Sequence, residues 1–111
     1  MNVYDAAHNL ARAIKSSDEY KSYKNIHDDL YGDPKTKEMI EDFRNNAMEI
    51  QMAQMSGKEV DSSKMEQMKK LEEILMGDPK INEFFQWEMR FGQMMNDVNK
   101  ILGEVLEIES K

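Results

Sequence analysis

One phrase occurs twice in this chain and limits how the rest of it can fold. Residues 30–35 read Leu-Tyr-Gly-Asp-Pro-Lys, and residues 75–80 read Leu-Met-Gly-Asp-Pro-Lys. Glycine readily adopts the left-handed conformation that ends a helix, and aspartate caps the helix that follows. Proline suits the first helical position because its missing N–H has no partner there. Each copy therefore predicts a helix, a sharp corner with a left-handed glycine, and a second helix.

Apolar residues recur every three or four positions along five segments, which is the spacing of a helix with one buried face. These segments cover about residues 2–15, 17–31, 34–55, 62–76 and 79–107. Ser16 and Glu19 have the spacing of a capping box and mark the start of the second helix, and Asp61 or Ser62 can cap the fourth. The 111 residues thus predict a single all-α domain, a helical bundle with two long helices.

The helix expected over residues 34–55 carries two separate apolar faces. At about 100° per residue, one face holds Met39, Ile40, Phe43, Ala47 and Ile50. A second face, well over 100° away in that projection, holds Met48, Met52 and Met55. A helix with two apolar faces needs two packing partners, and a short chain of long helices buries only a thin core. The sequence therefore predicts that homo-oligomerisation completes the fold.

The last helix shows a heptad pattern, the repeat of helices that pack side by side. Its apolar residues alternate at spacings of three and four: Phe84, Trp87, Phe91, Met94, Val98, Ile101, Val105 and Ile108. This row predicts a seam against another long helix, in the bundle core or between subunits.

Eleven methionines are an unusual number for a chain of this length. Residues 56–61 are the only plausible loop of any length. Five methionines flank it: Met48, Met52, Met55, Met65 and Met68. Methionine is flexible and polarizable and serves adaptable binding grooves, so these residues can form a peptide-binding surface near the loop. Ordinary core or subunit packing is the other interpretation. Together with the seam from Phe84 to Ile101, they are the candidate oligomer or partner interface.

Composition restricts the partners and the location. The formal charge of −7 opposes direct binding to nucleic acids or anionic lipids. The absence of cysteine excludes disulfides, thiolate metal sites and thiol nucleophiles. No apolar run approaches the roughly 20 residues that span a bilayer, and the N-terminus has no signal-peptide pattern. We therefore expect a cytoplasmic protein.

The polar residues offer little catalytic chemistry. A di-metal carboxylate bundle needs Glu-x-x-His on two helices, whereas residues 5–8 read Asp-Ala-Ala-His and His27 has Lys24 three positions earlier. The Gly-Asp-Pro-Lys phrase is no phosphate loop, because its proline removes a backbone donor. Ser62 has no histidine nearby in sequence to activate it. We expect no enzyme activity, catalytic residue, metal or cofactor.

A longer pattern, Phe-Arg-x6-Gln-x2-Gln-Met-x-Gly-x-Glu, runs from Phe43 to Glu59. Further matching positions are Tyr4-Asp5, Ala7, Leu10-Ala11, Ile14, Ser17, Glu19, Tyr20 and Asp33. With these residues the chain resembles the YlbF/YmcA-like family of small bacterial helical proteins, and in particular its YheA-like branch.

The resemblance implies an all-helical fold, self-association and no catalytic residues. Related branches look like regulatory adaptors that assemble with partner proteins and influence competence, biofilm formation, sporulation and RNA processing. Some relatives hold an iron–sulfur cluster through cysteines, which this chain lacks. We expect a non-enzymatic cytoplasmic regulatory or scaffolding protein that contacts itself, as a dimer or higher oligomer, and another regulatory protein. The alternative is a methionine-rich, chaperone-like module that binds peptides or unfolded clients.

Overall fold

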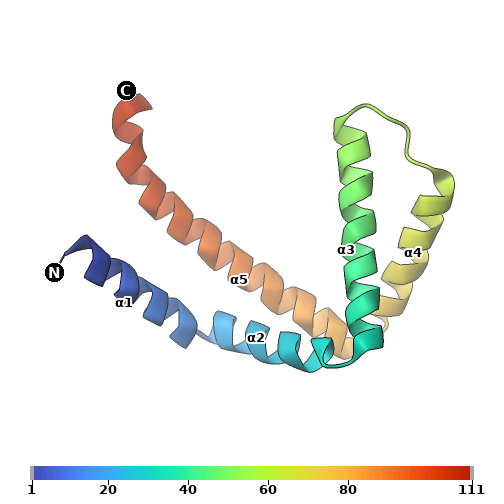
Figure 1. Cartoon of the computed structure of the whole chain (residues 1–111), viewed down its shortest axis with the longest axis horizontal. Helices are drawn as coiled ribbons and strands as arrows, with labels where there is room; N and C mark the ends of the chain where they lie inside the picture. Colours follow the sequence, from blue (N-terminus) through green and yellow to red (C-terminus); the bar gives the residue numbers. More distant parts are fainter. Residues whose placement is uncertain (1, 111) are drawn as a thin grey trace. The chain divides into compact units, whose positions relative to one another are not determined.

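The computed structural model describes residues 2–110, with side chains as far as Glu107. Across these residues the chain forms five α-helices, a short 3-10 helix and no β-strand (Figure 1). The helices are α1 (Val3–Ser16), α2 (Asp18–Tyr31), α3 (Pro34–Met55), α4 (Ser62–Met76) and α5 (Pro79–Gly103), followed by the 3-10 helix η1 (Glu104–Ser110). The expected all-α class is confirmed, with α3 and α5 as the long helices of 22 and 25 residues.

The final helix differs from the expected span, which reached about residue 107. Its α-helical part ends at Gly103, and the chain continues as η1. Glycine is a poor helix former, so it is a suitable point for this change. The side chain of Ile108, the last member of the predicted heptad, lies outside the described residues.

The capping box expected at Ser16 and Glu19 is wrong. Ser16 is still the last residue of α1, and Ser17 adopts the extended conformation of a cap, with φ −71° and ψ 151°. The Ser17 hydroxyl accepts a hydrogen bond from the Tyr20 N–H at 3.2 Å and donates one to the Ile14 carbonyl at 2.6 Å. One side chain thus caps the end of α1 and the start of α2.

Aspartate caps the helix after each Gly-Asp-Pro corner, as predicted. The Asp33 carboxylate accepts from the Lys35 N–H at 3.3 Å and from the Thr36 hydroxyl at 2.8 Å. The Asp78 carboxylate accepts from the Lys80 N–H at 2.9 Å. Proline follows both caps and begins α3 and α5.

The left-handed conformation expected at Gly32 and Gly77 is wrong. Gly57, in the loop after α3, is the glycine with positive φ among the described residues, at 73°. Gly77 has φ −74° and ψ −13°. The N–H groups of Gly32 and Gly77 each donate to the carbonyl four residues earlier at 3.1 Å, so the helical bonding continues through them. Both corners therefore form without a left-handed residue.

The chain divides into two compact units. One is continuous, from His27 to Glu83, and contains the antiparallel hairpin of α3 and α4, the helices whose backbones lie close together (Figure 1). Its buried hydrophobic side chains are Leu30, Ile40, Leu75 and Ile81. Lys80 and Asp29 form an ion pair in the same unit. We call this part the hairpin unit.

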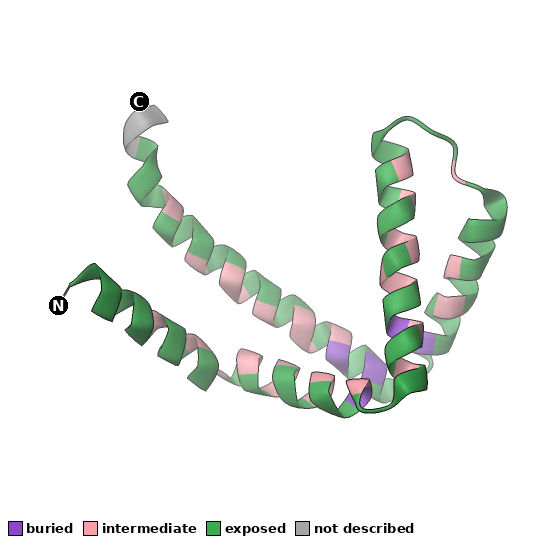
Figure 2. Cartoon of the chain, in the orientation of Figure 1, coloured by how far each residue is buried: buried purple, intermediate pink, exposed green. Residues whose placement is uncertain are grey.

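The other unit combines the residues up to Ile26 with those from Phe84 onward, and we call it the terminal unit. Its centre is an aromatic stack between α2 and α5. The Tyr23 ring lies 5.6 Å from Phe84 and 5.5 Å from Phe91, nearly parallel to both, and Tyr20 lies 5.9 Å from Phe91. The Tyr23 hydroxyl also donates to Glu88 at 3.3 Å. Phe84 is fully buried, and burial decreases along α5 toward η1 (Figure 2).

Candidate functional site

Met48, Met52 and Met55 form a row on α3 that we call the methionine surface. Their side chains are 60%, 62% and 80% exposed, whereas Ile40 on the other apolar face is fully buried. The two faces that the sequence predicted for this helix are therefore different in kind: one packs inside the hairpin unit and the other is open. Because methionine side chains are flexible, such a row can adapt to the shape of a docked protein.

Met65 and Met68 lie on α4, where they line a shallow depression of about 400 Å³ with Glu66, Lys69 and Glu72. Met65 is exposed and Met68 is half-buried. The five methionines that flank the loop in sequence are thus divided between a row on α3 and a depression on α4.

Charged side chains connect the two helices near the loop. Lys64 of α4 forms an ion pair with Glu49 of α3, and the hydrogen bond and charge of this carboxylate raise the pKa of Lys64. Both residues also line a groove of about 340 Å³ that includes Met52 and Lys58. An apolar row with a charged border has the composition of a protein interface.

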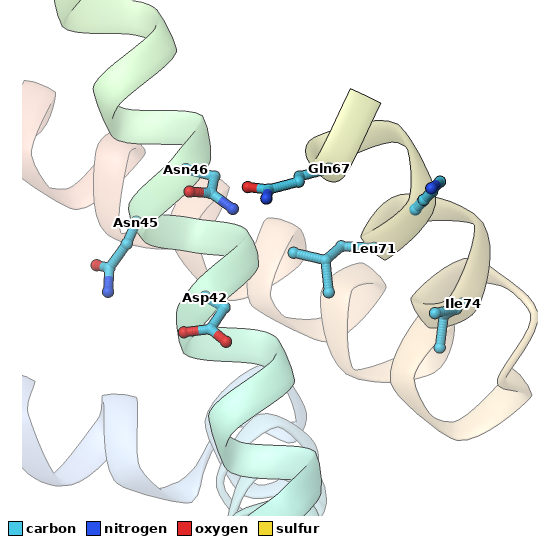
Figure 3. A pocket seen from close by; sticks show the side chains of 7 residues that line it. Asp42, Asn45, Asn46, Gln67, Leu71 and Ile74 are labelled. Atoms are coloured by element: carbon cyan, nitrogen blue, oxygen red, sulfur yellow. The ribbon is translucent and has the colours of Figure 1, made fainter. Parts of the chain in front are cut away.

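A larger groove of about 520 Å³, which was not predicted from the sequence, lies between α3 and α4. It is lined by Asp42, Asn45, Asn46, Gln67, Lys70, Leu71 and Ile74. In Figure 3, Asn46 and Gln67 point toward one another from the two helices. A signal was present in the sequence, because Asn46 is three residues after Phe43 and four before Ile50, on their apolar face. A polar residue in such a row marks an open part of a helix contact.

The predicted seam on α5 is only partly a core. Phe84 is fully buried, while the next four members are half-buried: Trp87, Phe91, Met94 and Val98. Ile101 is 62% exposed. The partner helix at the buried end is α2, through Tyr20 and Tyr23. These two tyrosines were not predicted from the sequence as the partners of this seam.

The ends of the terminal unit expose further apolar side chains. On α1, Val3 and Tyr4 are about four-fifths exposed, and no side chain of this helix is buried. At the other end, the exposed fractions run from 54% to 77% for Ile101, Leu102, Val105 and Leu106. These two groups, which we call the α1 face and the α5 end face, lie outside the predicted interface, except for Ile101 and for Val105, which belongs to the predicted heptad row.

The described residues were also compared with the requirements of a metal site and of a membrane-spanning helix. No group of three His, Asp or Glu side chains is placed to hold a metal ion there. His27 stacks on Tyr31 at 4.1 Å and lies 3.2 Å from the Asp28 carboxylate. Within the same residues, no helix combines the length and the apolar character needed to cross a bilayer.

Comparison with known proteins assigns the chain to a family. The family described as control of competence regulator ComK, YlbF/YmcA, matches residues 3–107. The chain belongs to the YlbF/YmcA family. A UPF0342 protein of Symbiobacterium thermophilum is 37% identical over 107 residues, which cover 96% of either chain.

Two solved structures have a similar fold. YheA of Bacillus subtilis is 26% identical to this YlbF/YmcA family member, with a TM-score of 0.62 over 96% of this chain and 97% of that one. RicA of Bacillus subtilis, solved in complex with RicF, is 20% identical, with a TM-score of 0.61 over 98% and 96% of the two chains. The expected YheA-like branch is confirmed by the first of these and by the UPF0342 relative.

Proposed function

We propose that this YlbF/YmcA family member is a non-enzymatic regulatory or scaffolding protein that acts in the cytoplasm through contacts with itself and with other proteins. The observation that carries the proposal is the methionine surface, three exposed apolar side chains in one row on a long helix. Single exposed apolar residues are ordinary, but a contiguous row marks an interaction site.

The comparisons support a role in protein binding. The family is described as controlling a competence regulator, and RicA was solved in complex with RicF. The net charge of −7 supports proteins, rather than nucleic acids or anionic membranes, as the binding partners.

Affinity capture with a matched pair of variants tests this function. We expect the tagged wild-type chain to recover one or two stoichiometric proteins from a native lysate of its source. Replacing Met48, Met52 and Met55 by Gln keeps the side-chain length but makes the row polar, so these proteins should be lost. Met89, on α5, is 75% exposed, and Met89→Gln is the control that should retain them. Equal recovery by the triple variant and the control contradicts the assignment of the partner site.

A methionine-rich client-binding module is the second candidate, favoured by the exposed methionine surface and by the α4 depression lined by Met65 and Met68. This role predicts that the chain binds many unfolded proteins weakly. At equimolar concentration it should then suppress the aggregation, followed by light scattering, of an unrelated enzyme that has been unfolded by heat. A chain that leaves this aggregation unchanged and captures one partner supports the scaffolding role instead.

A further inference from the structure

The apolar row of α1 that begins at the α1 face is only partly covered within the chain. Val3, Ala7, Leu10 and Ile14 follow helical spacing, but Val3 and Ala7 are exposed, and Leu10 and Ile14 are only half-buried. An isolated helix of 14 residues is only marginally stable in water, because helical stability comes mainly from packing an apolar face. Within the terminal unit, the first turn of α1 and the last turns of α5 lie apart (Figure 1). A second molecule packed on this face would supply the burial that the chain itself does not provide.

The α5 end face has the same need. Ile101, Leu102, Val105 and Leu106 are all more than half exposed, across the end of α5 and the start of η1. Unlike Phe84 at the buried start of the α5 seam, all four of these side chains are exposed. Two incompletely covered apolar faces thus belong to the same unit.

The charges of these two faces are complementary. Helix α1 carries Arg12 and Lys15 against Asp5, a net charge of +1. Residues 97–107 carry Asp97, Glu104 and Glu107 against Lys100, a net charge of −2. Contact between α1 and the α5 end therefore brings opposite charges together, whereas a pairing of like faces brings like charges together.

The net charges of the two units favour the terminal unit, and not the methionine surface of the hairpin unit, as the place where a second copy binds. Residues 27–83 contain 8 basic and 14 acidic residues, a net charge of −6. The rest of the chain contains 7 basic and 8 acidic residues, a net charge of −1. Two copies that meet through their terminal units therefore repel each other far less than two that meet through their hairpin units.

We propose that two copies of the chain exchange their first helices: α1 of each copy packs its apolar face on the α5 end face of the other. The arrangement is a two-fold dimer with two identical junctions, as expected for a self-complementary interface. This inference rests on the proposed self-association and names its surface. It leaves the methionine surface of both copies free for a different protein.

Disulfide cross-linking tests the junction directly, because the chain has no natural cysteine. The variants are Tyr4→Cys on the α1 face, with either Ile101→Cys or Leu106→Cys on the α5 end face. Tyr4→Cys chains are mixed with Ile101→Cys or with Leu106→Cys chains and oxidised. In at least one of these two mixtures, a cross-linked product of twice 13.0 kDa should form. Met48→Cys is the control and should form none with any of them. An intramolecular disulfide in a Tyr4→Cys/Leu106→Cys chain of 13.0 kDa overturns the exchange, as does an efficient Met48→Cys homodimer.

Mixing two defective variants tests the exchange independently. Val3→Glu and Leu106→Glu change exposed side chains, so each chain should keep its helical circular dichroism but run as a 13.0 kDa monomer in light scattering. A dimer with one chain of each kind keeps one intact junction, so the mixture should recover the doubled mass. Met89→Glu should keep the wild-type mass. Failure of the mixture to recover overturns the reciprocal arrangement, and a monomeric wild type overturns the dimer itself. In either case, partner capture still tests the scaffolding role separately.

Discussion

Phe84→Ala should destabilise the chain more than any other single truncation in the aromatic stack. The ring is fully buried and pairs with Tyr23 at 5.6 Å and with Phe85 at 5.5 Å. A buried aromatic side chain covers roughly 150–250 Å². At about 25 cal/mol per Å², and after allowing for the Cβ that alanine keeps and for compactness of the unfolded chain, the loss is about 3–5 kcal/mol. Domains of this size are stabilised by about 5–15 kcal/mol, so the variant should be close to unfolding.

Two further substitutions separate the contributions of burial and of ring pairing to this loss of stability. Phe91→Ala should cost roughly half as much, because its ring is only half-buried. Phe84→Leu keeps most of the apolar volume but removes two ring pairs, each worth about 0.5–1.5 kcal/mol, so it should cost about 1–3 kcal/mol. Urea unfolding, followed by circular dichroism at several protein concentrations, separates monomer stability from association. Met89→Ala is the exposed control, within about 0.5 kcal/mol of the wild type. A Phe84→Ala loss below about 1 kcal/mol would refute the assignment of this ring to the core.

The remaining predictions concern the caps, the loop and the cooperativity of the fold. Asp33→Ala should cost about 1 kcal/mol in thermal unfolding through the lost cap of α3, whereas Asp33→Asn should cost much less; equal losses would contradict capping. Gly57→Ala should cost about 1–2 kcal/mol, because φ of 73° disfavours a side chain, and a neutral result would contradict the left-handed loop. The single domain expected from the sequence predicts one unfolding transition that coincides for tryptophan fluorescence and circular dichroism, whereas two separated transitions would show that the two units unfold independently.

Two of the caps were predictable from the sequence because their bonds span only two residues, whereas the cap of α2 was expected one residue too early, at Ser16 in place of Ser17. The caps at Asp33 and Asp78 bond to N–H groups two residues ahead, so their spacing alone identifies them. The left-handed state of Gly32 and Gly77 was not predictable in the same way. Glycine permits that conformation without requiring it, and here helical bonding continues through both residues.

Contacts between distant segments were beyond the sequence pattern. The heptad on α5 identified which residues face a partner, but not that burial stops near its middle or that Tyr23 stacks between two of its rings. A periodic row is the same whether a helix, a second copy or water lies against it. The groove between α3 and α4 was missed for a related reason, since it depends on how the two helices approach.

The division of the chain has a consequence for its synthesis. The terminal unit is assembled from both ends of the sequence, and the hairpin unit is the uninterrupted stretch between them. Tyr23 therefore leaves the ribosome 61 residues before Phe84, the first of its two stacking partners on α5. At about 5–20 residues per second, the interval is roughly 3–12 s, far longer than helix formation takes. During that time α1 and the first half of α2 are without α5, so the apolar side chains that α5 later covers stay open to water and to other chains.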